Sequence, residues 1–97
     1  MTARSADVTL DSILTHSDDV LFQQVGGEAV LLDLASEQYF GLDPVGTRIW
    51  ELLDGQTSLG SIHSVLCAEY DADGARIGDD LLALAGALAQ AGLVRTA

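Results

Sequence analysis

The chain has 97 residues, of which 48% are hydrophobic, and its formal net charge is −11 because 15 carboxylates face only 4 basic residues, all arginine. This length allows one domain with a modest core. The negative charge repels phosphate backbones and anionic lipid, which argues against nucleic acid and membrane partners and favours basic ones.

Cellular location is suggested by what the sequence lacks. No window approaches the roughly 20 apolar residues of a membrane span, and residues 1–7 lack the apolar core of a signal peptide. Cys67 is the single cysteine, so an internal disulfide is impossible. We therefore expect a cytoplasmic protein.

The first segment, residues 1–17, is predicted to be an N-terminal arm, extended or weakly β, ahead of a domain over residues 18–97. Its triplet Asp11-Ser12-Ile13 is similar to the serine motif of phosphopantetheine carrier proteins. Carrier proteins are helical bundles with that serine near mid-chain, whereas a β-rich stretch follows Ser12. An ordinary polar arm is the preferred interpretation.

An antiparallel meander of three strands is predicted next. Residues 20–25 are rich in β-branched and aromatic side chains, and Gly26-Gly27 supplies the positive φ angle of a tight hairpin turn. Residues 29–34 form an apolar return strand, which is expected to be central. After a turn over residues 35–38, a short strand runs to Leu42.

Three helices are predicted after the strands. Asp43 is the expected N-cap of the first, with Pro44 at its first position and Asp54-Gly55 at its end. Thr57 or Ser58 caps the second, and the third runs from about residue 75 to 91, where Gly92 stops it. The expected apolar stripes comprise Val45, Ile49, Leu52 and Leu53, then Leu59, Ile62, Leu66 and Tyr70, then Ile77, Leu81, Leu84 and Leu88.

Strands followed by helices with short connections indicate an α+β domain. The second and third helices have helix-turn-helix spacing. We therefore predict a winged-helix-like fold with a three-stranded antiparallel sheet followed by three helices. Leu93 and Val94 are expected to fold back onto the core.

No constellation of residues in the chain points to catalysis or to a metal. His63 and Cys67 lie four residues apart on one helix face, but a structural pair is favoured because a metal site needs three or four ligands. The acidic residues between Asp71 and Asp80 lack the ligand spacing of a calcium loop. Trp50 is expected in the core, and Arg48 in a surface salt bridge.

The short strand from Gln38 to Leu42 is the most informative candidate site. If it lies at the sheet edge, its backbone donors and acceptors are open, and it contains neither Lys nor Pro to block pairing. Tyr39 and Phe40 should point to opposite faces. An open edge beside a helix favours addition of an extended peptide as a further strand. A short edge strand covered by the N-terminal arm is equally compatible with the residues.

The sequence contains a series of short motifs: Leu32-Asp33, Tyr39-Phe40-Gly41-Leu42, Pro44-Val45-Gly46, Ile49-Trp50, Leu53-Asp54-Gly55, Tyr70-Asp71, Asp79-Asp80-Leu81 and Ala91-Gly92-Leu93-Val94. With these motifs, the run from Val30 to Gly55 resembles the PqqD-like family, and the resemblance extends over residues 18–94. Each motif is weak alone, whereas their order and spacing together are fairly specific.

The resemblance implies a recognition element for ribosomally made, post-translationally modified peptides, including those of pyrroloquinoline quinone and lasso-peptide pathways. Members bind the leader segment of a precursor peptide as an added strand and present it to a modifying enzyme or leader peptidase. They do no chemistry and need no cofactor. The implied peptide-binding residues are Glu37, Gln38, Tyr39, Phe40 and Gly41 on the strand, and Gly78, Asp79 and Leu82 on the third helix.

Two other functions are retained as alternatives. A domain that pairs with a second copy through its edge strand would form a homodimer. A winged-helix DNA-binding regulator is disfavoured because its recognition helix should be basic, whereas Arg76 here stands against Asp79 and Asp80. Under the peptide-binding hypothesis, a proline at Phe40 should abolish binding without unfolding the domain, provided that the Phe40 N–H faces the peptide.

Overall fold

A computed structural model describes residues 8–71 and 73–97 of the chain. Its order of elements is β1 (Leu14–His16), β2 (Val20–Val25), β3 (Glu28–Asp33), β4 (Gln38–Leu42), α1 (Pro44–Leu52), α2 (Leu59–Glu69), α3 (Gly74–Gln90) and β5 (Val94–Thr96). The predicted α+β class, with a three-stranded antiparallel sheet followed by three helices, is confirmed. The predicted third helix is confirmed, because α3 begins at Gly74 and ends at Gln90.

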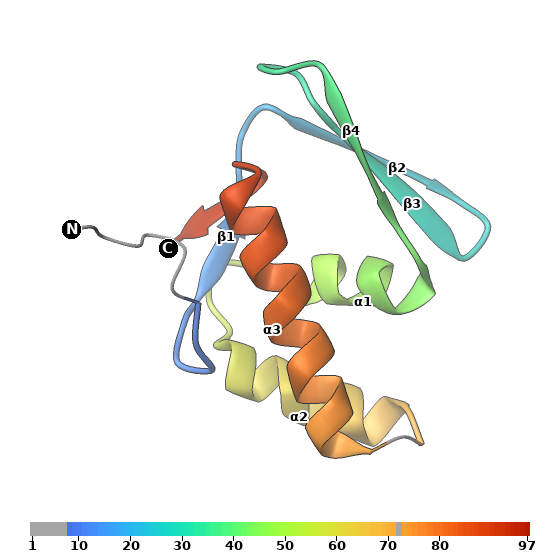
Figure 1. The fold of residues 1–97 in the computed structure, drawn as a ribbon, viewed down its shortest axis with the longest axis vertical. Coiled ribbons are helices and arrows are strands. Elements are labelled where there is room, and N and C mark those ends of the chain that lie inside the picture. Colours follow the sequence, from blue (N-terminus) through green and yellow to red (C-terminus); the bar gives the residue numbers. More distant parts are fainter. Residues whose placement is uncertain (1–7, 72) are drawn as a thin grey trace.

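The sheet has the order β2-β3-β4, so β3 is central, as predicted, and β4 forms an edge. Gly26, with φ of 64°, opens the two-residue turn between β2 and β3. Figure 1 shows that α1 lies beneath the sheet and that α2 and α3 extend away from it. One face of the sheet therefore packs on α1, and the other faces outward.

The helix boundaries follow from their capping residues. The Asp43 carboxylate accepts the Gly46 amide at 2.7 Å at the start of α1. Ser58, one of the two predicted caps, accepts the Ser61 amide at 3.2 Å for α2. Asp73 accepts the Ala75 amide at 3.0 Å for α3. Each cap satisfies a backbone donor that has no partner inside its helix.

Strands β1 and β5 form a second, two-stranded antiparallel sheet. The prediction that Leu93 and Val94 return to the core is confirmed, because both are buried. Their pairing with the N-terminal segment was not predicted. That segment is also bonded to the α1–α2 connection, since the Gly55 amide donates to the Leu14 carbonyl at 3.0 Å. The part of the predicted arm over residues 1–7 lies outside the described residues.

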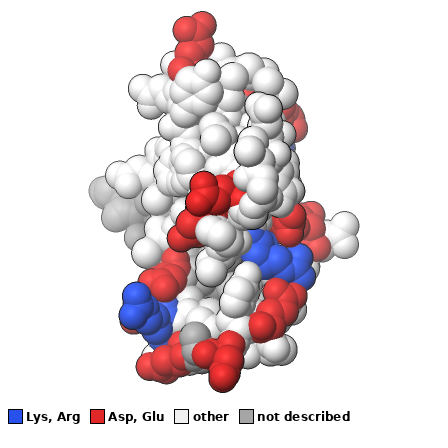
Figure 2. Space-filling model, turned by 90° about the vertical axis from the view of Figure 1, so that its right-hand side faces the viewer, with Lys and Arg blue, Asp and Glu red and all other residues white. Residues whose placement is uncertain are grey.

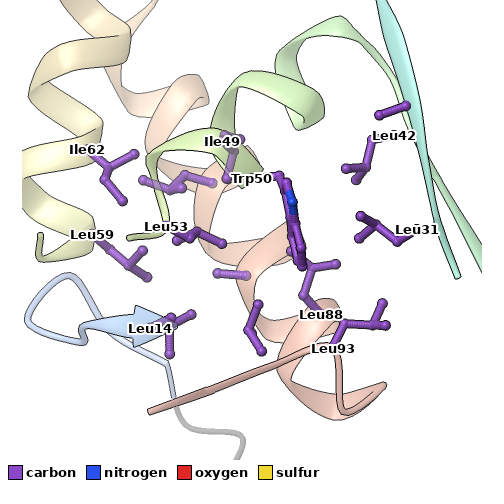
Figure 3. Packing of buried hydrophobic residues seen from close by; sticks show 14 of the residues in the cluster. Leu14, Leu31, Leu42, Ile49, Trp50, Leu53, Leu59, Ile62, Leu88 and Leu93 are labelled. Carbon is purple, nitrogen blue, oxygen red and sulfur yellow. The ribbon is translucent and has the colours of Figure 1, made fainter. Parts of the chain in front are cut away.

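The core lies between the three-stranded sheet and the three helices, and the small β1–β5 sheet adds Leu14 and Val94 to it. Figure 3 shows Trp50 with the sheet leucines on one side and the helix side chains on the other. Trp50 is only 4% exposed, as predicted, and the ring of His16 stacks on it with centroids 3.7 Å apart. The largest of the fully buried side chains are Leu14, Leu31, Ile49, Leu53, Leu59, Ile62, Leu66, Leu81 and Leu88.

Arg48 and Glu69 connect α1 to α2 on the surface. The guanidinium Nε lies 2.9 Å from Glu69 Oε1, and Nη2 lies 2.6 Å from Oε2. These hydrogen bonds lower the pKa of Glu69 and raise that of Arg48. The predicted surface salt bridge of Arg48 is therefore confirmed, and such a paired, two-pronged geometry orients both side chains.

Two leucines on neighbouring strands provide a matched test of the core. Leu31 of β3 is completely buried, whereas Leu21 of β2 is 54% exposed. Leu31→Ala should lower the free energy of unfolding by about 2–5 kcal/mol, because it leaves a cavity beneath the sheet. Leu21→Ala should change it by less than about 0.5 kcal/mol. Urea denaturation measures both, and equal losses would contradict the assignment of the two faces.

The Asp54 carboxylate stabilises the start of the α1–α2 connection, and we expect this stabilisation to be lost in acid. Its Oδ1 accepts the amides of Gln56 and Thr57, both at 2.9 Å, and Oδ2 accepts the Thr57 hydroxyl at 3.0 Å. The hydrogen bond from Gln56 is the largest of the effects that lower the pKa of Asp54.

A lowered folded-state pKa means that the stabilisation is complete above the ordinary pKa of about 4 and is lost as the pH falls below it. Asp54→Ala should therefore lower the Tm at pH 7 by more than it does near pH 2.5. Thermal unfolding followed by circular dichroism at both pH values measures this difference. A deficit independent of pH would show that the charge of Asp54 contributes nothing.

Candidate functional site

The candidate site is the edge strand β4 and the hollow beside it. Tyr39 is 74% exposed and points to the outer face of the sheet, whereas Phe40 is half-buried against the core. The two aromatics thus point to opposite faces, as predicted. A side chain added at Gly41 would meet nothing within 4 Å, so the strand is open at that position.

Two backbone hydrogen bonds show which β4 groups are free. The Leu34 amide donates to the Asp19 carbonyl at 2.8 Å, so the even-numbered residues of β3 bond toward β2. The Glu37 amide donates to the Asp33 carbonyl at 2.7 Å on the β4 side. Because antiparallel strands alternate, odd-numbered residues of β3 bond toward β4.

The register pairs Leu31 with Phe40 and Leu32 with Tyr39. The backbone groups of Phe40 are therefore directed at β3, and those of Tyr39 and Gly41 at the open edge. The condition attached to the proline prediction at Phe40 is not met, since a proline there would remove a bond inside the sheet. The corresponding position on the open edge is Tyr39.

A hollow of about 500 Å³ lies between β4, α1 and α3. It is lined by Gly41, Leu42, Asp43, Val45, Gly46, Ile49, Asp80 and Leu84. A second, more apolar hollow of about 150 Å³ shares Val45, Ile49 and Asp80 with it and is closed by side chains of α2 and α3. At the other end of β4, a hollow of about 40 Å³ lies against Ala91. We call the first and the third of these hollows, which residues of β4 line, the β4–α3 groove.

The α3 residues of the groove differ from the predicted ones. Asp80, Leu84 and Ala91 lie on one side of the helix, because they are spaced by four and seven residues. Gly78 instead faces α2, where a side chain would approach His63 Nε2 at 3.3 Å. Two further predicted residues, Asp79 and Leu82, are respectively exposed and packed against the core. None of these three lines a hollow beside β4.

The sequence predicts that the α1 residues of the groove pack in the core, or cap the helix, rather than line a site. Val45 was predicted to lie in the core stripe, yet it is 38% exposed and lines the groove together with Ile49. The predicted N-cap Asp43 also lines it. Spacing of four residues identified Val45 and Ile49 as one face, but it does not reveal where the core ends along that face. Only the position of β4 does.

The pair His63 and Cys67 is held in a structural role. His63 Nε2 lies 2.7 Å from the Gly74 carbonyl, which can only accept, so this nitrogen carries a proton. Cys67 Sγ lies 3.5 Å from the same nitrogen. A protonated nitrogen cannot remove the thiol proton, so this geometry does not activate a nucleophile. Within residues 8–71 and 73–97, no three His, Cys, Asp or Glu side chains form a metal-binding group.

Asp43 provides a test of whether its carboxylate caps α1 or remains free for a ligand in the groove. Asp43→Ala should lower the free energy of unfolding by about 1 kcal/mol because the Gly46 amide loses its acceptor. Asp43→Ser keeps an acceptor and should fall within a few tenths of a kcal/mol of the unsubstituted chain. Denaturant titration of both variants decides between the roles, and equal stabilities would exclude capping.

Comparison with known proteins gives consistent relatives. The family described as "Coenzyme PQQ synthesis protein D (PqqD)" matches residues 28–94. A PqqA binding protein of Xanthomonas axonopodis pv. citri is 34% identical over 88 residues, which are 91% of this chain and 96% of that protein. The bifunctional coenzyme PQQ synthesis protein C/D of Methylorubrum extorquens is 38% identical over 69 residues, 71% of this chain, but this chain spans only 18% of its length.

Two solved structures resemble the fold. TbiB1 in complex with the TbiA(beta) leader peptide has a TM-score of 0.75 and 40% sequence identity, with coverage of 82% of this chain and 93% of that one. Lasso peptide synthetase B1 complexed with the leader peptide also has a TM-score of 0.75, at 23% identity, covering 86% and 98% of the two chains. The second likeness shows the fold alone.

Proposed function

We propose a function that proceeds from one premise: the chain belongs to the PqqD family. On this premise, the protein is a non-catalytic recognition element that binds the leader segment of a ribosomal precursor peptide. The single observation that carries this proposal is the open edge of β4, where the backbone groups of Tyr39 and Gly41 lack a strand partner among the described residues. The relatives named as PqqA binding proteins, and TbiB1 with its leader peptide, support it.

The leader would add antiparallel to β4 and extend the sheet. Its main chain would exchange hydrogen bonds with Tyr39 and Gly41, whose groups point outward from the sheet edge. Alternate side chains of the peptide would enter the β4–α3 groove, where Val45, Ile49 and Leu84 offer apolar contact. Among the predicted site residues, we retain Glu37 to Gly41 and replace the α3 set with Asp80, Leu84 and Ala91.

Charge gives the groove a preference. Asp80 lies at its margin, and its nearest cation, Arg76 Nε, is 3.8 Å away on an exposed surface. An exposed ion pair at this separation contributes little interaction energy, so Asp80 can still interact with a second cation. A basic side chain of the leader would therefore be favoured beside Asp80, and an acidic one disfavoured.

The bound leader is presented to a modifying enzyme or a leader peptidase of the same pathway. The domain itself carries out no chemistry, which agrees with the structural role of His63 and Cys67. None of the helices in the described residues has the length and apolarity that a bilayer crossing requires. We propose a cytoplasmic site of action because the exposed Cys67 is the single cysteine in the chain.

The proline test now belongs at Tyr39. Tyr39→Pro removes an edge N–H without removing a bond to β3, and its matched control, Gln24→Pro, removes an outward-facing N–H on the opposite edge strand β2. Isothermal titration with synthetic leader peptides encoded beside the gene measures affinity. Tyr39→Pro should weaken binding by about tenfold or more, because it deletes a main-chain bond and leaves a peptide carbonyl unpaired.

Gln24→Pro should bind as the unsubstituted chain does, and circular dichroism checks that both variants are folded. Equal affinity of a folded Tyr39→Pro variant would rule out strand addition at β4. Pairing with a second copy through this edge remains the alternative. It predicts a dimer in sedimentation that Tyr39→Pro dissociates, together with no heat signal from any leader.

A further inference from the structure

We propose that the outer face of the β2-β3-β4 sheet is the docking surface for the enzyme that acts on the bound peptide. This inference rests on the proposed function and adds the partner's location and chemistry. The partner would present an apolar centre surrounded by Lys and Arg. The face that we mean is formed by Leu21 and Val25 of β2, Val30 and Leu32 of β3, and Tyr39 of β4, and we call it the outer sheet face.

The apolar side chains of the outer sheet face are contiguous. Leu21 pairs with Leu32, and Leu32 pairs with Tyr39, so one apolar row crosses all three strands. Leu21 is 54% exposed, Val25 69% and Tyr39 74%. Directly opposed residues on one sheet face lie close together. Single exposed apolar residues are ordinary on protein surfaces, but a contiguous patch marks an interaction site.

Folding of this domain does not account for these side chains. Burial of Ala29 and Leu31 on the inner face already attaches the sheet to the helices. An antiparallel sheet with one solvated face normally carries polar residues on that face. Here Gln23 and Glu28 are the polar exceptions in an otherwise apolar pattern.

The charge around the face defines the partner's chemistry. Between residues 18 and 47 there is no Lys, Arg or His, and the charged residues are Asp18, Asp19, Glu28, Asp33, Glu37 and Asp43. Figure 2 shows the consequence: the upper part of the molecule, where the sheet lies, is largely white with acidic residues at its margin, and the large blue groups lie lower. Such a rim attracts a basic partner surface and repels a second acidic copy of this chain.

The outer sheet face is continuous with the proposed peptide edge. Tyr39 belongs to both, since its backbone faces the open edge and its side chain lies on the outer face. A peptide added to β4 would direct alternate side chains onto the same face and enlarge it. A partner docked there would contact domain and peptide together. It should therefore bind the peptide-loaded domain more tightly than the empty one.

Two matched valines test the surface. Val30→Lys places a charge on the outer sheet face, and Val65→Lys places the same charge at a similarly exposed position on α2, where the exposures are 39% and 36%. Val25→Lys, at the most exposed valine, is the second variant should Val30→Lys fail to fold. The probes are the modifying enzymes and the leader peptidase encoded by the neighbouring genes, immobilised for biolayer interferometry with and without leader peptide.

One of these enzymes should bind the unsubstituted domain, and more tightly when leader is present. The outer-face variants should weaken that binding by about tenfold or more, as expected at an interface centre, and Val65→Lys by less than about twofold. Titration of the leader alone should be unchanged in all variants. If the unsubstituted chain itself bound no leader peptide, the proposed function would be refuted.

Three results would overturn the docking surface while leaving the proposed function intact. The first is equal enzyme affinity of Val30→Lys and Val65→Lys. The second is the absence of binding to every neighbouring enzyme. The third is a dimer of the unsubstituted chain in sedimentation that Val30→Lys dissociates, because a second copy would then occupy the face.

Discussion

Burial of alternate residues along β3 is the constraint on which the rest of the molecule depends. The side chains of Ala29 and Leu31 point from β3 toward the helices and are buried there, so the side chains of the residues between and beside them face outward. A slip of one residue would exchange the two faces and expose the core side chains. This strand therefore fixes the pairing of β2 and β4, and with it the direction of every backbone group at the β4 edge.

The same constraint couples the candidate site to the core. Leu42 at the end of β4 is 4% exposed and anchors the strand, whereas Tyr39 is free. Immediately after Leu42, the Asp43 cap starts α1, which places Val45 and Ile49 beside the edge. The edge and the α1 side of the groove thus come from a short continuous segment, and Asp80 and Leu84 of α3 supply the other side. A preformed site of this kind reduces the ordering cost of binding a peptide.

The β2-β3-β4 sheet contains no basic side chain, because the described arginines lie on other elements. Arg48 is engaged with Glu69 across α1 and α2, and Arg76 lies beside Asp80 on α3. The described basic side chains therefore lie away from the sheet, with Arg95 on β5. The two surfaces that we propose, the β4 edge with its groove and the outer sheet face, consequently favour basic or neutral partners through electrostatic complementarity.

Local chemistry determined much of the structure. The capping residues Asp43 and Ser58, the Gly26 turn and the apolar periodicities are short-range signals. The sequence therefore predicted the class, the three strands of the main sheet followed by three helices, and the edge strand. Long-range contacts decided the rest. The pairing of β1 with β5, the inward direction of the Phe40 N–H and the turn of Gly78 toward α2 depend on how distant elements pack. A helical period gives the faces of α3 but not their neighbours, because those are set only when the core closes.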